Sequence, residues 1–98
     1  MQDYFADTVE IEGIILEVDK PSSADDERKR YGAICRALRK RMDMNRPEFS
    51  VWLGIPYRTI QDWELGQYKM PEYVLRLIAY KVKIEEMLKS GKLVEVKE

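Results

Sequence analysis

The sequence predicts a mainly α-helical domain with a short β-strand at each end. Between residues 22 and 91, apolar residues recur every three or four positions, which is the spacing of one helix face. Residues 8–18 and 92–97 are instead rich in Val, Ile and Leu and alternate with polar residues, as strands do. Ninety-eight residues suit one domain. We expect an acidic N-terminal strand or arm over 1–21, a helical domain over 22–91 and a C-terminal strand or tail over 92–98.

The N-terminal stretch, residues 8–18, predicts one strand. Val9 and Ile11 share a face, and the alternation changes phase at Gly13, where a β-bulge is natural. An alternative is an amphipathic arm that orders only against a partner. In either case we expect the helical core to form without residues 1–20, because the helices carry apolar faces of their own.

The first helix is expected to run from about residue 22 to Met42. Its apolar stripe consists of Tyr31, Ile34, Leu38 and Met42. Cys35 is expected at the edge of the core, and as the only cysteine it can form no internal disulfide. A single unpaired cysteine fits a reducing cytoplasm.

Two short helices are expected over residues 46–53 and 57–65. Asn45 can cap the first of them, and Glu48 completes a capping box three residues later. Gly54 then ends this helix, since glycine tolerates the left-handed conformation common at helix ends. The sequence therefore predicts two helices with a tight turn between them.

The second short helix separates its residues by angle. At 100° per residue, Ile60 and Trp63 fall on an inward arc. The outward arc carries hydrogen-bonding side chains of the kind that read base edges in a major groove: Tyr57, Arg58, Gln61 and Asp62.

This stretch resembles the helix-turn-helix of the phage repressor and Cro type, also called the xenobiotic-response-element family. The matching residues are Phe49, Ser50, Gly54, Ile55, Ile60, the run Trp63-Glu64-x-Gly66, and Pro71. The resemblance covers roughly residues 36–80, less than half of the chain. Ser50 stands where alanine is commoner, and Pro56 stands where the family usually has a serine-like cap.

The resemblance implies a sequence-specific DNA-binding transcriptional regulator that binds double-stranded DNA as a dimer. It places base-reading residues at Tyr57, Arg58, Gln61 and Asp62, and phosphate contacts at Asn45, Arg46, Gln67, Tyr68 and Lys69. It also implies an ion pair between Arg39 and Glu64. Arg58 suits guanine and Gln61 suits adenine, whereas Asp62 accepts from cytosine, orients Arg58 or lies on a solvated face.

The last helix, expected over residues 71–89, carries two apolar stripes. One contains Val74, Ile78 and Val82 and is expected to cover the helical core. The other has heptad-like spacing and predicts a homodimer interface at Leu77, Tyr80, Ile84 and Met87. Alternatively, the N-terminal strand covers both stripes within one chain. The tail, residues 92–97, is expected to pair with residues 8–18 in the same chain or across a dimer.

Charge and composition exclude several functions. Residues 1–27 hold nine acidic side chains and one basic, a net charge of −8, whereas residues 28–98 hold a net charge of +7. The chain has no histidine, and we expect no metal, no cofactor and no enzymatic activity. We expect no membrane span and a cytoplasmic location. The acidic segment keeps an alternative open, an antitoxin that holds a toxin partner and autoregulates its operon.

Overall fold

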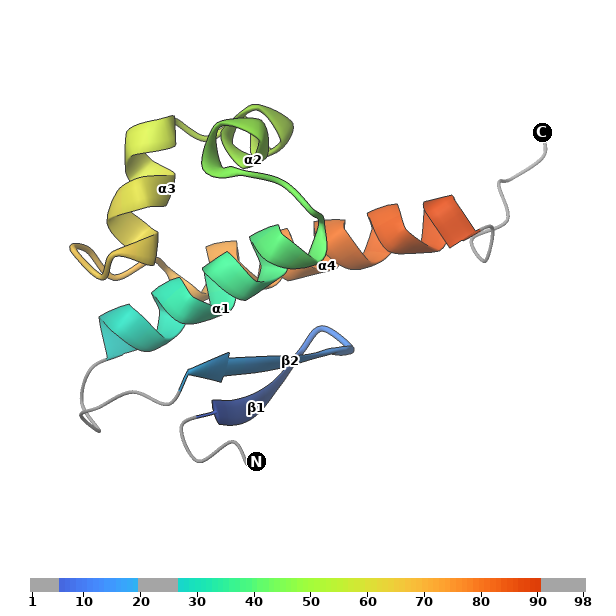
Figure 1. The fold of residues 1–98 in the computed structure, drawn as a ribbon, viewed down its shortest axis with the longest axis horizontal. Helices are drawn as coiled ribbons and strands as arrows, with labels where there is room; N and C mark the ends of the chain where they lie inside the picture. The colour runs from blue at the N-terminus through green and yellow to red at the C-terminus, as the bar shows by residue number, and fades with distance from the viewer. Residues whose placement is uncertain (1–5, 20–26, 91–98) are drawn as a thin grey trace.

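Three layers make up the fold in the computed structural model, which describes residues 6–19 and 27–90 (Figure 1). A central layer holds α1 (Glu27–Arg41) and α4 (Glu72–Ser90). The short helices α2 (Arg46–Leu53) and α3 (Tyr57–Glu64) lie on one side of it, and a β-hairpin lies on the other. The expected mainly α-helical class with an N-terminal β element is confirmed. The expected C-terminal strand lies outside the described residues.

The N-terminal stretch is a hairpin and not the single bulged strand expected. β1 (Ala6–Ile11) pairs antiparallel with β2 (Ile14–Asp19), and the ladder closes at Ile11 and Ile14. Glu12 and Gly13 form the two-residue turn, with φ angles of 49° and 84°. Two successive positive φ angles give the turn a twist that matches the strands it joins. The change of phase at Gly13 therefore marks a reversal of the chain.

The hairpin belongs to the same core as the helices. Ile14, Leu16 and Val18 on the inner face of β2 are buried and pack into the cluster that α1 and α4 form. Alternation along the strand leaves Ile15 outside, with 64% of its surface exposed. The hairpin thus covers an apolar surface that the helices alone would leave in water, while the expectation that the helical core forms without residues 1–20 stays a prediction.

The central layer has the two inward stripes that the sequence predicts. Ile34, Leu38 and Met42 are buried on the α1 side, and Ile78 and Val82 on the α4 side. Cys35 lies in the middle of this layer and not at its edge, with none of its surface exposed. Burial raises the pKa of its thiol from 9.0 to about 12, so the thiol is neutral at physiological pH.

The outer stripe of α4 is not covered by the hairpin. Leu77 is 63% exposed and Tyr80 is 54% exposed, while Ile84 and Met87 are partly buried. The alternative in which both stripes are covered within one chain therefore fails for Leu77 and Tyr80 over the described residues. No helix in the described ranges is long and apolar enough to cross a membrane.

The predicted cap and turn between the short helices are present. The Asn45 side chain accepts a hydrogen bond from the Glu48 backbone N–H at 2.8 Å, and the Glu48 carboxylate accepts one from the Asn45 N–H at 2.9 Å. Gly54 ends α2 in the left-handed conformation, with φ 73°. Ser50, expected only to be small, donates its hydroxyl to the Ile55 carbonyl at 2.6 Å. This bond spans the turn and fixes the direction in which the chain leaves α2 for α3.

A close approach of α1 and α3 depends on Gly32. A Cβ atom at this position would lie 2.2 Å from the Trp63 carbonyl oxygen and 3.1 Å from the Glu64 Cα atom. Since real side chains do not approach backbone atoms so closely, only glycine fits here. Gly32 thus lets the end of α3 lie directly on α1.

Candidate nucleic-acid interface

The outward side of α3 carries the four residues expected to read bases. Tyr57 and Arg58 are exposed in its first turn, and Gln61 and Asp62 are partly exposed one turn later. The Arg58 side chain is 80% exposed, and its Nε lies 3.8 Å from the Asp62 Oδ1 atom. This i,i+4 arrangement agrees with the reading in which Asp62 orients Arg58. The inward side is fixed by buried Ile60 and Glu64.

The starts of the two short helices differ in chemistry. The capping box at α2 satisfies two backbone N–H groups and places the Glu48 carboxylate at the helix start. Pro56 precedes α3 and makes no side-chain hydrogen bond to its first turn. The Thr59 N–H donates to the Pro56 carbonyl at 3.0 Å, so the N–H groups left without a cap at this start are those of Tyr57 and Arg58, where the helix dipole favours an anionic ligand.

Glu64 is the centre of an arginine cluster behind this surface. Its side chain is fully buried, and Arg39 holds both carboxylate oxygens, through Nε at 2.8 Å and through a terminal nitrogen at 3.0 Å. The predicted Arg39–Glu64 ion pair is thus present. Arg46 adds a bond from Nε at 3.0 Å, and Arg36 donates to the Glu64 backbone carbonyl at 2.7 Å.

The cluster joins three helices around α3. Arg36 and Arg39 come from α1, Arg46 begins α2, and Glu64 ends α3. Three guanidinium groups surround one carboxylate, which leaves an excess of two positive charges beside the short helices. A fully desolvated carboxylate needs such partners, since an unpaired buried charge is strongly unfavourable. The cluster therefore fixes the orientation of α3 on the core.

Arg46, one of the expected phosphate contacts, is part of the arginine cluster. Its Nε donates to the Glu64 carboxylate, and the hydrogen bond to Glu64 raises its pKa. The side chain is still 25% exposed, so its contact with phosphate stays a prediction. The N–H groups of Asn45 and Glu48 at that helix start are also occupied. Arg46 is thus first a structural residue.

The loop after α3 supplies the other expected phosphate residues. Gln67 and Tyr68 are exposed, which leaves both side chains accessible. Lys69 donates to the Glu27 carboxylate at 2.6 Å, and its Nζ lies 5.4 Å from the centre of the Tyr31 ring. Because this ion pair is exposed, a phosphate can compete for the lysine at little cost.

Comparisons of the chain with protein-family models, with curated proteins and with solved structures return no match. Over the described residues, His, Cys, Asp and Glu side chains form no group of three or more that could hold a metal ion. The features of this chain that bear on its function are the outward surface of α3 and the arginine cluster behind it.

Proposed function

We propose that this protein is a cytoplasmic, sequence-specific DNA-binding transcriptional regulator with a helix-turn-helix of the phage repressor and Cro type. The observation that carries the proposal is the two-sided α3. Its inner side is fixed by Ile60 and by the arginine-bound Glu64, and its outer side offers four hydrogen-bonding side chains. A helix held rigidly from behind and polar in front suits the major groove, which is wide enough to admit an α-helix.

The chemistry of the exposed side chains suits base edges. A guanidinium such as Arg58 can donate two hydrogen bonds to guanine O6 and N7, and an amide such as Gln61 can pair with adenine N6 and N7. The uncapped start of α3 can receive a backbone phosphate while the side chains enter the groove. Tyr57 and Asp62 complete the contact surface on either side of Arg58.

The distribution of charge supports this direction of approach. The acidic hairpin lies in the layer opposite α2 and α3, with Glu10 and Glu17 exposed on its outer face (Figure 1). The arginine cluster lies between α1 and the short helices. The electrostatic field of the chain is therefore expected to present the α3 side to DNA and to turn the hairpin away.

We further propose that the protein binds as a homodimer through the outer stripe of α4. Leu77 and Tyr80 lie exposed there in a line that Ile84 and Met87 continue. A two-fold dimer would present two α3 helices to half-sites about 34 Å apart, one turn of the double helix.

Selection of bound duplexes from a random pool tests the DNA-binding proposal. The expected result is one enriched site with two-fold symmetry, whose half-sites are separated by about ten base pairs. Recovery of unrelated duplexes with no shared motif would contradict sequence-specific binding. Sedimentation at tens of micromolar, a range that detects moderate affinities, tests the dimer separately, and a monomer throughout would contradict it.

A second candidate function is an antitoxin-like role, favoured by the outer face of the hairpin. Ile15 is exposed there next to Glu10, its partner across the ladder, and to Glu17 on the same face. A basic protein with an apolar contact would fit this surface. Co-expression with the product of a neighbouring small reading frame tests this role. A complex that Ile15→Asp disrupts would support it, and two proteins that purify separately would contradict it.

A further inference from the structure

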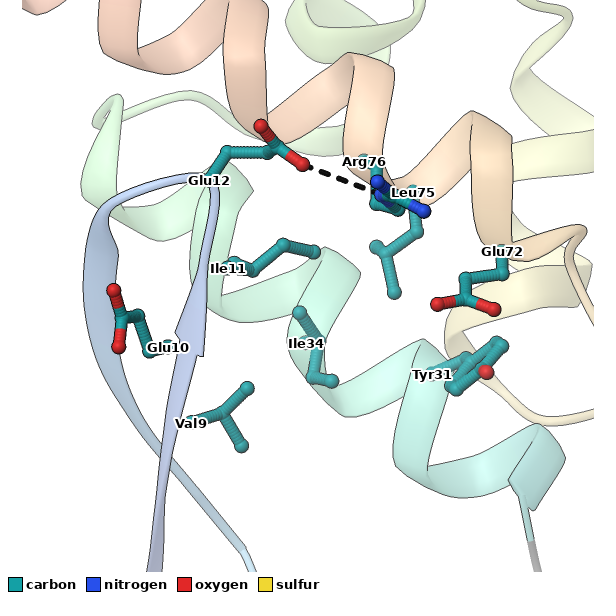
Figure 2. Close-up of a pocket in the computed structure, with 9 residues that line it drawn as sticks. All are labelled: Val9, Glu10, Ile11, Glu12, Tyr31, Ile34, Glu72, Leu75 and Arg76. Atoms are coloured by element: carbon teal, nitrogen blue, oxygen red, sulfur yellow. Dashed lines mark hydrogen bonds and ion pairs between the residues drawn. The ribbon is translucent and has the colours of Figure 1, made fainter.

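The free edge of β1 borders a groove between the hairpin, α1 and α4 (Figure 2). Four consecutive residues, Val9 to Glu12, line it. Val9 and Ile11 point toward the helices, whereas Glu10 points to the opposite side of the hairpin. Successive residues of a strand share an edge and not a face. The groove of about 260 Å³ is therefore bounded by the strand's backbone edge, above a floor that includes buried Ile34 and Leu75.

The backbone groups on this edge have no partner strand among the described residues. The ladder closes at Ile11, opposite Ile14, in a two-residue hairpin. Hydrogen-bonded pairs alternate along such a ladder, so the N–H and C=O groups of Thr8 and Glu10 face outward. No backbone hydrogen bond from another described element reaches either residue. β1 is an open template for one more strand.

The groove continues along α4 beyond an ion pair. Arg76 Nε and a Glu12 carboxylate oxygen lie 3.2 Å apart and close the first groove (Figure 2). On the far side, the same two residues border a second hollow of about 400 Å³ with Tyr73, Leu77 and Tyr80. A strand placed beside β1, at the usual spacing of about 4.8 Å, would lie toward this apolar surface. It would also enlarge a two-stranded sheet, which is marginal by itself.

We propose that residues 92–97 of a second copy of this chain add to β1 as a third strand. Residues 91–98 lie outside the described part of the chain. Their alternation places Val94 and Val96 on one face, toward the helices, and Leu93, Glu95 and Lys97 on the other. The inference rests on the proposed dimer through α4 and names the segment that the two subunits exchange.

The reach of the segment favours a second copy over the same chain. The hairpin turn lies at the level of Arg76 to Lys83 on α4, and β1 lies further toward the start of that helix. From Ser90 back to the stretch of α4 that faces the turn, Lys83 to Arg76, is about 10–21 Å along the helix axis, at 1.5 Å per residue. Residues 91–97 span at most about 25 Å when extended. Within one chain only the last residues of the segment would therefore pass the hairpin turn, too few to pair with both Thr8 and Glu10.

A two-fold dimer removes this difficulty. The exposed stripe on α4 runs from Tyr73 through Leu77 and Tyr80 to Leu88, so its midpoint falls near Tyr80. Antiparallel packing about this midpoint pairs Tyr73 with residue 88 of the other copy, and each Ser90 then lies beside the start of the opposite α4. The groove lined by Glu72 and Leu75 begins there. The segment that follows Ser90 thus emerges next to the open edge of the other subunit.

Disulfide formation between two differently labelled chains tests the proposal. Both chains carry Cys35→Ala. One also carries Glu10→Cys, and the other carries a single cysteine at position 93, 94, 95, 96 or 97. Mixed and oxidised, they should form a disulfide-linked heterodimer most readily through position 93, 95 or 97, with positions 94 and 96 clearly slower. This alternation is the signature of a strand. Asp43→Cys, at an exposed site outside the groove, replaces Glu10→Cys in the control.

Two outcomes would overturn the proposal. Equal yields at all five positions, or yields no higher than with Asp43→Cys, would show that no strand docks on β1. Sedimentation of the unmodified chain separates this result from a failure of the dimer itself. A dimer that forms no position-dependent cross-link would contradict the strand addition but not the proposed α4 interface. Hydrogen exchange gives an independent readout. The Thr8 and Glu10 amides should be protected at high protein concentration. They should lose this protection on dilution or in Val94→Pro, which cannot complete the ladder. Protection that neither dilution nor Val94→Pro changes would contradict the addition of a third strand from a second copy.

Discussion

Replacing Glu64 by glutamine tests whether the arginine cluster holds α3 in place. The substitution keeps the shape of the side chain and removes its charge, which leaves Arg36, Arg39 and Arg46 without their carboxylate. Glu64 is fully buried in its side chain, and the Arg39 side chain is 12% exposed. Breaking a buried pair typically costs about 3–5 kcal/mol, and we expect Glu64→Gln to lose stability in this range.

The matched control is Glu86→Gln. Arg41 and Glu86 form an ion pair of 2.7 Å, as short as the Arg39–Glu64 pair, but their side chains are 39% and 34% exposed. Exposed pairs contribute about 0–1 kcal/mol. For a domain of this size, 1 kcal/mol shifts Tm by roughly 4–8 °C, so Glu64→Gln should lower Tm by at least about 12 °C and Glu86→Gln by a few degrees at most.

Urea unfolding followed by circular dichroism at 222 nm measures both variants at one temperature. Should Glu64→Gln fail to fold, Arg46→Met gives a second test, because it leaves the two-oxygen contact of Arg39 in place and is expected to cost less. Equal losses of unfolding free energy in Glu64→Gln and Glu86→Gln would show that burial does not determine how much the ion pairs of Glu64 stabilise the fold.

Three further predictions concern the core. Leu16→Ala should destabilise the fold by about 2–5 kcal/mol, and the exposed neighbour Ile15→Ala by less than about 0.5 kcal/mol, in the same urea assay. Equal effects would show that the inner face of the hairpin contributes nothing to the stability of the core. Gly32→Ala should cost more than Gly54→Ala, because a Cβ at Gly32 meets the backbone of α3 at 2.2 Å, whereas Gly54 has open space and only an unfavourable φ of 73°; the reverse order would contradict the close contact. The free energy of unfolding should fall as pH rises from about 9 toward about 12, because the Cys35 thiol loses its proton at lower pH in the unfolded chain than in the folded one. This part of the fall should be missing in Cys35→Ala, and identical pH profiles of the two proteins would contradict the burial of the thiol.

The sequence predicts best where local chemistry decides the structure. α2 spans Arg46–Leu53 as expected, because Asn45 caps its start and Gly54 ends it. The single strand expected over residues 8–18 was wrong, because a two-residue turn places Ile11 and Ile14 on the same face three positions apart. A bulge produces a similar change of phase, and glutamate before Gly13 is not a usual turn signal.

The site was predictable only in part, because its contacts depend on how the helices pack. The Arg39–Glu64 pair follows from the resemblance to known helix-turn-helix proteins. Arg36 lies on the same face of α1, one turn before Arg39, but nothing local indicates that it reaches the Glu64 carbonyl. Gly32, in the middle of a helical pattern, was the available signal for a close approach. The role of Arg46 depends on the angle between α2 and α3, which the sequence alone does not specify.

Base preference at Arg58 tests the central claim most directly. The measurement is fluorescence anisotropy of the selected duplex and of its single-base variants, with wild type, Arg58→Ala and Lys40→Ala. Lys40→Ala removes the same charge from an exposed side chain beside Glu17 and Val18 of β2, outside both α3 and the proposed dimer surface. We predict that Arg58→Ala weakens binding to the selected site by about 1–3 kcal/mol, roughly 5- to 150-fold, and relaxes preference at one base pair, while Lys40→Ala keeps the full preference. An Arg58→Ala variant with unchanged affinity and unchanged base preference would contradict the assignment of α3 as the reading helix.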